Sequence, residues 1–106
     1  MTMNAVIESK MPELRALCEK YHVARLELFG SATTDEWNPQ TSDFDFLVTF
    51  TPPSPPMTGF DQYMGLLLDL QAILERKVDL LEECAMKNRY LIRRVNETRK
   101  PLYVAA

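Results

Sequence analysis

The segment that most constrains the fold is DFDFLVTF, residues 43–50. Its first four residues alternate between polar and apolar, which predicts a β-strand, because successive side chains of a strand point to opposite faces. Phe44 and Phe46 then face the core, while Asp43 and Asp45 share the other face. Two carboxylates ~5 Å apart repel by about 3 kcal/mol at an effective dielectric of roughly 20. This acidic face therefore predicts a site that a cation visits.

The other segments predict an alternation of helices and strands. The segments with apolar residues at helical spacing are those after Pro12, at 60–75 and at 86–98. The segments that alternate as strands do are 23–30 and 77–83. A connector at 31–42 is rich in turn-forming residues and predicts one helical turn that starts at Ser31.

This order predicts an α/β (α+β) fold, with a small mixed β-sheet and helices packed on one face. The apolar stripe of 60–75 needs a sheet to cover it. The prolines of 51–59 predict a stiff surface loop, and 100–106 an extended tail. With 106 residues the chain has room for one core, so we expect a single domain, 1–106.

Composition argues against several classes of protein. The net charge of −3 gives no sign of the basic patch that duplex-binding proteins carry, so we do not expect nucleic acid as a partner. The longest apolar run, near 66–68, is far shorter than a membrane span, and we expect no leader, because the sequence does not open with a basic and then apolar segment. Cys18 and Cys84 form no C-x-x-C motif. We therefore expect a reduced, cytoplasmic protein without a membrane partner.

Further polar residues lie in or after the other two expected strands. Asp79 interrupts the apolar run VDLL, so three carboxylates converge if that strand lies beside 43–50. Such a set suits Mg²⁺, which prefers carboxylates, water and substrate phosphates as ligands. Phosphoryl and nucleotidyl transfer use metal ions in this way. Gly30 and Ser31 end the first strand, where main-chain N–H groups and a hydroxyl can bind phosphate.

Each of these features also has a purely structural explanation. The D-x-D pair could be edge-strand charges or a turn cap, Asp79 could pair with Lys77, and Ser31 could cap a helix. Trp37 fits a packing role better than stacking on an adenine. The basic cluster at 93–100 fits a solvated helix face, or a surface for an acidic partner, better than an RNA contact. The combination of G-S, D-x-D and a third aspartate favours a catalytic site.

That combination resembles the signature of the minimal nucleotidyltransferases (MNT), small members of the DNA polymerase beta-like superfamily. The signature is a strand ending in G-S, a short spacer, D-x-D on the next strand and a third aspartate on a later strand. The matching residues are Gly30, Ser31, Asp43, Asp45 and Asp79, with Ser42 just before the D-x-D. The resemblance covers nearly the whole chain, including the helix at 60–75 and the closing KPLYV.

The resemblance implies a polymerase-beta-like fold, a reaction and a partner. Similar proteins are often antitoxins that transfer AMP from ATP to a tyrosine hydroxyl of a HEPN-domain ribonuclease toxin, and so silence it. By the same resemblance Asp43 and Asp45 hold Mg²⁺ on the triphosphate, while Asp79 helps bind a second ion and assists deprotonation of the acceptor. The residues implied to bind the nucleotide are Gly30, Ser31 and Ser42, the first two at the β- and γ-phosphates.

The chain departs from the MNT pattern in two places. Many members carry an arginine or glycine soon after G-S, where residues 32–35 here read ATTD, and the spacer between Ser31 and Asp43 is longer than the commonest form by a single residue. The alternative to catalysis is an antitoxin that neutralises the HEPN toxin by binding alone. A third hypothesis is transfer to a small molecule or an RNA end. The open charged face also predicts a covering partner, either the HEPN protein or a second copy in a homo-oligomer.

Overall fold

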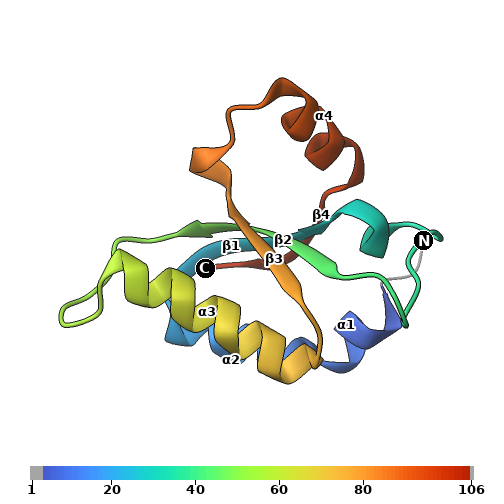
Figure 1. Cartoon of the computed structure of the whole chain (residues 1–106). Coiled ribbons are helices and arrows are strands. Elements are labelled where there is room, and N and C mark those ends of the chain that lie inside the picture. Colours follow the sequence, from blue (N-terminus) through green and yellow to red (C-terminus); the bar gives the residue numbers. More distant parts are fainter. Residues whose placement is uncertain (1–3, 106) are drawn as a thin grey trace.

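The structure, a computed structural model, describes residues 4–105. Its strands are β1 (Val23–Phe29), β2 (Phe44–Phe50), β3 (Val78–Glu82) and β4 (Lys100–Val104). Its helices are α1 (Ala5–Ser9), α2 (Met11–Lys20), α3 (Gly59–Leu74) and α4 (Arg89–Thr98), with two short 3₁₀ helices, η1 (Gly30–Thr33) and η2 (Glu83–Ala85). The sheet order is β3-β2-β1-β4; β2 and β3 run parallel, and the other neighbours are antiparallel (Figure 1). No helix within residues 4–105 is long and apolar enough to cross a membrane.

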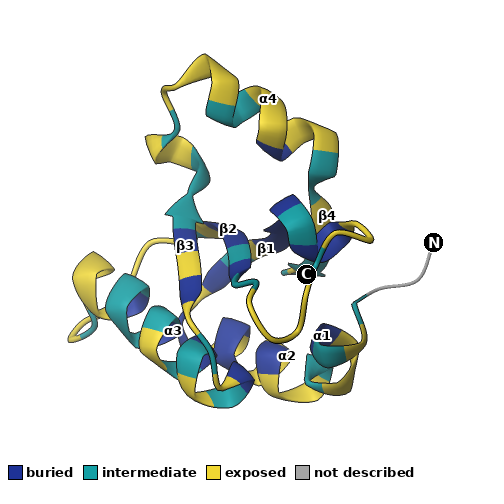
Figure 2. Cartoon of the chain, turned by 45° about the vertical axis from the view of Figure 1, so that its right-hand side comes forward, coloured by how far each residue is buried: buried dark blue, intermediate teal, exposed yellow. Residues whose placement is uncertain are grey.

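The two faces of the sheet are covered by different helices. α1, α2 and α3 lie against one face, where Phe44 and Phe46 are fully buried in the main core (Figures 1 and 2). α4 lies over the opposite face, where Val95 is fully buried and packs with Phe29 and Leu47. The predicted α/β fold with a small mixed sheet is thus confirmed. The expectation that the helices pack on one face is wrong for α4, because the second apolar cluster of Phe29, Leu47 and Val95 holds this helix on the opposite face.

Two boundaries differ from the sequence-based expectation. The segment expected as an extended tail contains β4, which pairs antiparallel with β1 and so satisfies main-chain groups along that edge. The last helix begins at Arg89 and not at Met86, because the Asn88 side chain caps it by accepting hydrogen bonds from N–H groups of its first turn.

α3 has clear start and stop signals. Thr58 and Asp61 form a reciprocal capping box, and Glu75 ends the helix in the left-handed conformation, with a φ of 53°. Gly65 lies so close to the ring of Tyr21, at the end of α2, that a Cβ at this position would overlap the ring. This close approach fixes α3 beside α2, on the side of the sheet away from α4.

Candidate active site

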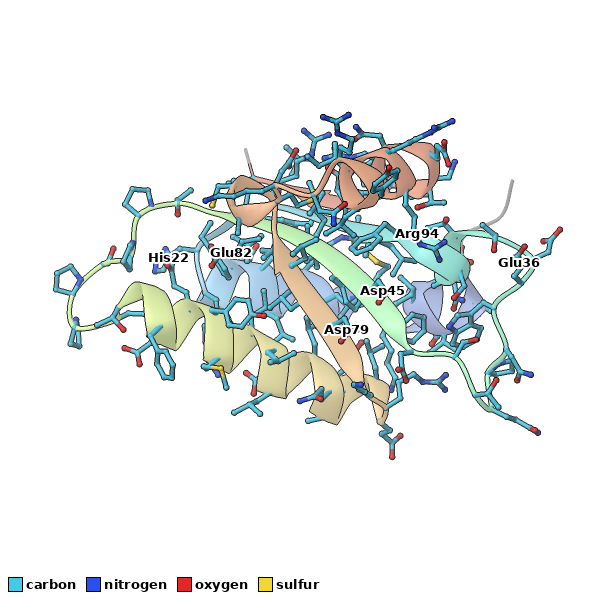
Figure 3. All side chains as sticks on the ribbon, turned by 45° about the horizontal axis from the view of Figure 1, so that its top comes forward. His22, Glu36, Asp45, Asp79, Glu82 and Arg94 are labelled. Atoms are coloured by element: carbon cyan, nitrogen blue, oxygen red, sulfur yellow. The ribbon has the colours of Figure 1, made fainter. Side chains whose placement is uncertain are left out.

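Two of the predicted carboxylates lie side by side on adjacent strands. Asp45 of β2 and Asp79 of β3 are register partners in the parallel pair, so their side chains lie on the same face of neighbouring strands. Figure 3 shows both on the side of the sheet that α4 covers. Asp45 is partly buried and Asp79 is exposed. The expectation that 77–83 lies beside 43–50 is therefore confirmed, and the pairing includes Asp45 and Asp79.

Burial and the neighbouring carboxylate make Asp45 a weak acid. Desolvation is the largest cause, and the hydrogen bond and negative charge of Asp79 add to it, so that the pKa of Asp45 rises from an ordinary 3.8 to about 6. The positive charge of Arg94 opposes this rise, and Asp43 adds a smaller increase. At pH 7 the Asp45 carboxyl is mostly ionised beside Asp79, an unfavourable arrangement that a divalent cation would relieve.

Gly30 is required at its position because the main chain passes close to Asp45. Its φ is +76°, in the left-handed region, and a Cβ would lie 2.7 Å from Asp45 Oδ2. Its N–H donates a 2.8 Å hydrogen bond to Thr98 Oγ1 of α4. Ser31 follows, partly buried, in η1, the helical turn expected at this corner. The Gly30 N–H is therefore engaged by α4, and the glycine matters for the close approach to Asp45.

Ser42 and Asp43 end the connector and directly precede β2. The main-chain oxygen of Asp43 accepts a 3.3 Å hydrogen bond from Trp37 Nε1, and Ser42 Oγ accepts one of 3.1 Å from a main-chain N–H of the connector. Within residues 4–105, no three His, Cys, Asp or Glu side chains gather closely enough to hold a metal ion as one group. Register pairing puts Asp79 directly beside Asp45, while Asp43 precedes Asp45 by two residues, ~6.6 Å along an extended chain, so the meeting of all three carboxylates stays a prediction. The roles of all three as metal ligands stay predictions.

Trp37 packs within the connector, as its packing interpretation predicts. The indole ring stacks on Phe44 with ring centres 4.9 Å apart and planes at 19°. The Arg76 guanidinium lies 4.9 Å from the centre of the Trp37 ring, and it donates a 3.1 Å hydrogen bond to the Pro39 main-chain oxygen. These contacts fix the connector just ahead of β2 and so help to position the acidic strand.

A pocket of about 470 Å³ lies beside the carboxylate pair. Its walls combine apolar and charged side chains, among them Phe29, Leu81, Leu91, Asp45, Asp79 and Arg94. Tyr63 also lines the pocket, and its hydroxyl donates a 2.5 Å hydrogen bond to the Leu80 main-chain oxygen. Burial, followed by the negative charges of Glu82 and Asp79, raises the pKa of Tyr63. The pocket therefore combines charged groups with a largely apolar wall.

Several residues around the site are missed by the sequence analysis. Arg94, Thr98 and Tyr63 lie on helices, where periodicity separates core from surface but does not show which surface faces the site. One usable signal exists. Arg94 and Thr98 are four residues apart and so share a helix face beside the buried Val95.

A buried ion-pair network supports the base of α4. Glu27 is 1% exposed, and Arg99 binds both of its carboxylate oxygens, with Nη2 2.7 Å from Oε1 and Nε 2.8 Å from Oε2. Arg99 also lies 3.2 Å from Glu83, and Arg25 lies 2.7 Å from Glu27. The hydrogen bonds from Arg99 are the main cause that lowers the pKa of Glu27. The solvated role expected for the basic cluster at 93–100 is therefore wrong for Arg99, whose side chain binds the buried Glu27 at the C-terminal end of α4.

Comparisons with known proteins assign the chain to a family. A family model described as "Nucleotidyltransferase domain" matches residues 14–102. MJ0128 of Methanocaldococcus jannaschii, which carries the name of a protein adenylyltransferase, is 36% identical over 83 residues, which are 78% of this chain and 80% of that protein. The chain therefore belongs to the nucleotidyltransferase domain family, as a minimal nucleotidyltransferase.

Solved structures have the same fold. One, described as a minimal nucleotidyltransferase, superposes with a TM-score of 0.73 at 23% identity and covers 94% of this chain and 96% of its own. Another is a chain of the complex between a tri-AMPylated HEPN toxin and an MNT antitoxin from Shewanella oneidensis, with a TM-score of 0.61 at 18% identity, covering 92% of this chain and 72% of that chain. Sequence identities this low relate the chains by fold alone.

Proposed function

We propose that this chain is an antitoxin that transfers AMP from ATP, with Mg²⁺, to a tyrosine hydroxyl of a cognate HEPN-domain toxin. The observation that carries the catalytic part is the pairing of Asp45 with Asp79 on adjacent strands, beside the Gly30 corner and an open pocket. The name of MJ0128 supports a protein as acceptor, and the Shewanella complex with its AMPylated HEPN toxin supports the partner.

The carboxylate pair fits a divalent cation. Both groups offer hard oxygen donors, and a cation there would relieve the interaction that, together with burial, raises the pKa of Asp45. Mg²⁺ in nucleotide sites is commonly held by one or two carboxylates plus water and substrate phosphates. Asp45 and Asp79 are thus the proposed ligands, with Asp43 as the further ligand that the sequence resemblance implies. When bound, the metal neutralises charge on the triphosphate.

The chain's own residues then act on the substrates. The acceptor oxygen forms a bond to Pα, the bond from Pα to the oxygen bridging to Pβ breaks, and pyrophosphate leaves with the electron pair. Asp79, exposed at the pocket, assists removal of the tyrosine proton. Ser31 and Ser42 are the proposed hydroxyl donors to phosphate, and Ser42 Oγ, which accepts a hydrogen bond from the connector, keeps its own proton to donate. Gly30 keeps this corner close to Asp45.

The test is a transfer assay in which the mass of the partner is measured. The chain, its cognate HEPN protein, ATP and Mg²⁺ should give a partner heavier by at least one AMP group, and EDTA should abolish the gain. Asp45→Asn and Asp79→Asn should each slow transfer by about a hundredfold or more, the equivalent of roughly 3 kcal/mol of transition-state stabilisation. Asp35→Asn, exposed in the connector, is the matched control and should transfer at the wild-type rate.

Three results would contradict the proposal at different points. An unmodified partner that is still neutralised by the wild type and by both site variants would leave binding alone as the mechanism. A partner whose tyrosine-to-phenylalanine variants still gain AMP would overturn the tyrosine acceptor. Consumption of ATP without a mass gain on the partner would favour transfer to a small molecule or RNA end.

A further inference from the structure

The charges around the pocket are arranged on two sides. Asp45 and Asp79 lie on the strands, and among the described residues that line the pocket Arg94 carries the one positive side chain. Figure 3 shows Arg94 reaching from α4 toward the side of the sheet that bears Asp45. In the part of the chain that the structure describes, no carboxylate forms an ion pair with Arg94. Arg94 therefore faces the site with its hydrogen-bond donors uncommitted to an acidic partner.

The neighbouring arginine of α4 differs in this respect. Arg93 Nε lies 3.1 Å from Glu97 Oε1, one helical turn along the exposed surface. The pocket lining includes Arg94 and not Arg93. The two residues have the same side chain and adjacent positions on one helix, so they form a natural pair for comparison.

The position of Arg94 is fixed by contacts between α4 and the Gly30 corner. Thr98 Oγ1 accepts the hydrogen bond from the Gly30 N–H at 2.8 Å and donates one of 2.9 Å to the Arg94 main-chain oxygen. Val95, next to Arg94, is fully buried against the sheet. Arg94 and Thr98 share a helix face, so the Arg94 side chain starts from the surface that faces the Gly30–Ser31 corner.

We propose that Arg94 binds the β- and γ-phosphates of the nucleoside triphosphate and stabilises the charge that develops on the departing pyrophosphate. This inference rests on the proposed function and adds a residue outside the G-S and D-x-D motifs. A triphosphate brings about four negative charges to a pocket that already holds two carboxylates, so a fixed cation beside it is favourable. The planar guanidinium can donate two parallel hydrogen bonds to phosphate oxygens.

A second role for Arg94 predicts different behaviour. If Arg94 served only as a counter-charge for Asp45, its removal would affect ions bound at the carboxylates and leave the phosphates untouched. Loss of a nearby positive charge should tighten the binding of Mg²⁺ alone under either role. Only direct phosphate binding predicts that the same change weakens the binding of the magnesium–triphosphate complex.

The experiment compares Arg94→Gln with Arg93→Gln in the full chain by isothermal titration calorimetry. The probes are Mg²⁺ alone, a non-hydrolysable ATP analogue with Mg²⁺, and AMP with Mg²⁺. Arg94→Gln should weaken binding of the triphosphate analogue by about 10- to 100-fold and change AMP binding by less than about threefold. The affinity of Arg93→Gln for the triphosphate analogue should match that of the wild type within about twofold. Arg94→Lys should recover part of the lost affinity, because lysine keeps the positive charge but lacks the paired donors of the guanidinium.

The outcomes separate this inference from the proposed function. Unchanged binding of the triphosphate analogue by Arg94→Gln, or an equal loss for AMP, would overturn the role of Arg94 and leave the proposed reaction standing. A wild-type chain that binds no nucleotide with Mg²⁺ would overturn both. Thermal unfolding of each variant supplies the folding control, and an exposed arginine should be replaceable without loss of the fold.

Discussion

Replacing Asp45 by asparagine should stabilise the protein without its metal while it removes activity. Asp45 is held partly buried beside Asp79, and its pKa is raised from 3.8 to about 6. The folded state therefore binds this proton more tightly than the unfolded state does. Between pH 4 and pH 6 the folded protein carries more bound protons, so the Asp45 contribution to stability falls as pH rises and is fully unfavourable above about pH 6.

The size of the effect follows from the raised pKa. A rise of this size corresponds to about 3 kcal/mol for a fully shielded group. Asp45 is only partly buried, and screening by water reduces the penalty to about 1–2 kcal/mol. Asparagine keeps the shape of the protonated carboxyl and can donate a hydrogen bond to Asp79. Asp45→Asn should thus match the wild type near pH 4 and exceed its free energy of unfolding by about 1–2 kcal/mol at pH 7.5.

The assay is urea unfolding followed by circular dichroism at several pH values from 4 to 8, with EDTA present. The difference in free energy of unfolding between Asp45→Asn and the wild type is the measured quantity, because other titrating groups cancel in it. Asp35→Asn, exposed in the connector, should give a difference that stays flat with pH. In a parallel series without EDTA, free Mg²⁺ at ten times its dissociation constant should stabilise the wild type by about 1.4 kcal/mol and the variant by much less. A difference that does not grow with pH would refute the reasoning.

Two further substitutions test the frame around the site. Gly30→Ala should lower the free energy of unfolding by about 1–3 kcal/mol in urea titrations, because its Cβ would lie 2.7 Å from Asp45 Oδ2 at a φ of +76°; wild-type stability would contradict this. Arg99→Met should lower the free energy of unfolding by about 3 kcal/mol, because it removes the bidentate partner of the buried Glu27. In a double-mutant cycle, adding Glu27→Gln should recover part of that loss. Because the pKa of Glu27 is lowered, the stability from this pair is present above the ordinary carboxyl range and should disappear as pH falls through the folded-state value.

Local patterns in the sequence were enough to predict most elements of the fold. The strand at 43–50, the helix at 60–75 and the strand at 77–83 lie within a residue or two of β2, α3 and β3. Alternation and helical spacing are set by the backbone geometry of each element, so they can be read one segment at a time. The tail that became β4 could not be predicted in this way, because its strand state depends on pairing with β1.

The sequence by itself determined that an acidic strand, a G-S corner and a third aspartate exist in this chain, because side-chain alternation and turn chemistry are local. Only the tertiary structure decided that Asp45 faces Asp79. A slip of one residue in the β2–β3 register would have set an apolar side chain beside Asp45 and turned Val78 and Leu80 of β3 away from the core. The tertiary structure also decided the hydrogen bond between Gly30 and Thr98 and the ion pair between Glu27 and Arg99. The two residues of each pair are 68 and 72 positions apart in sequence, respectively. Such contacts depend on the packing of whole elements, which no short pattern encodes.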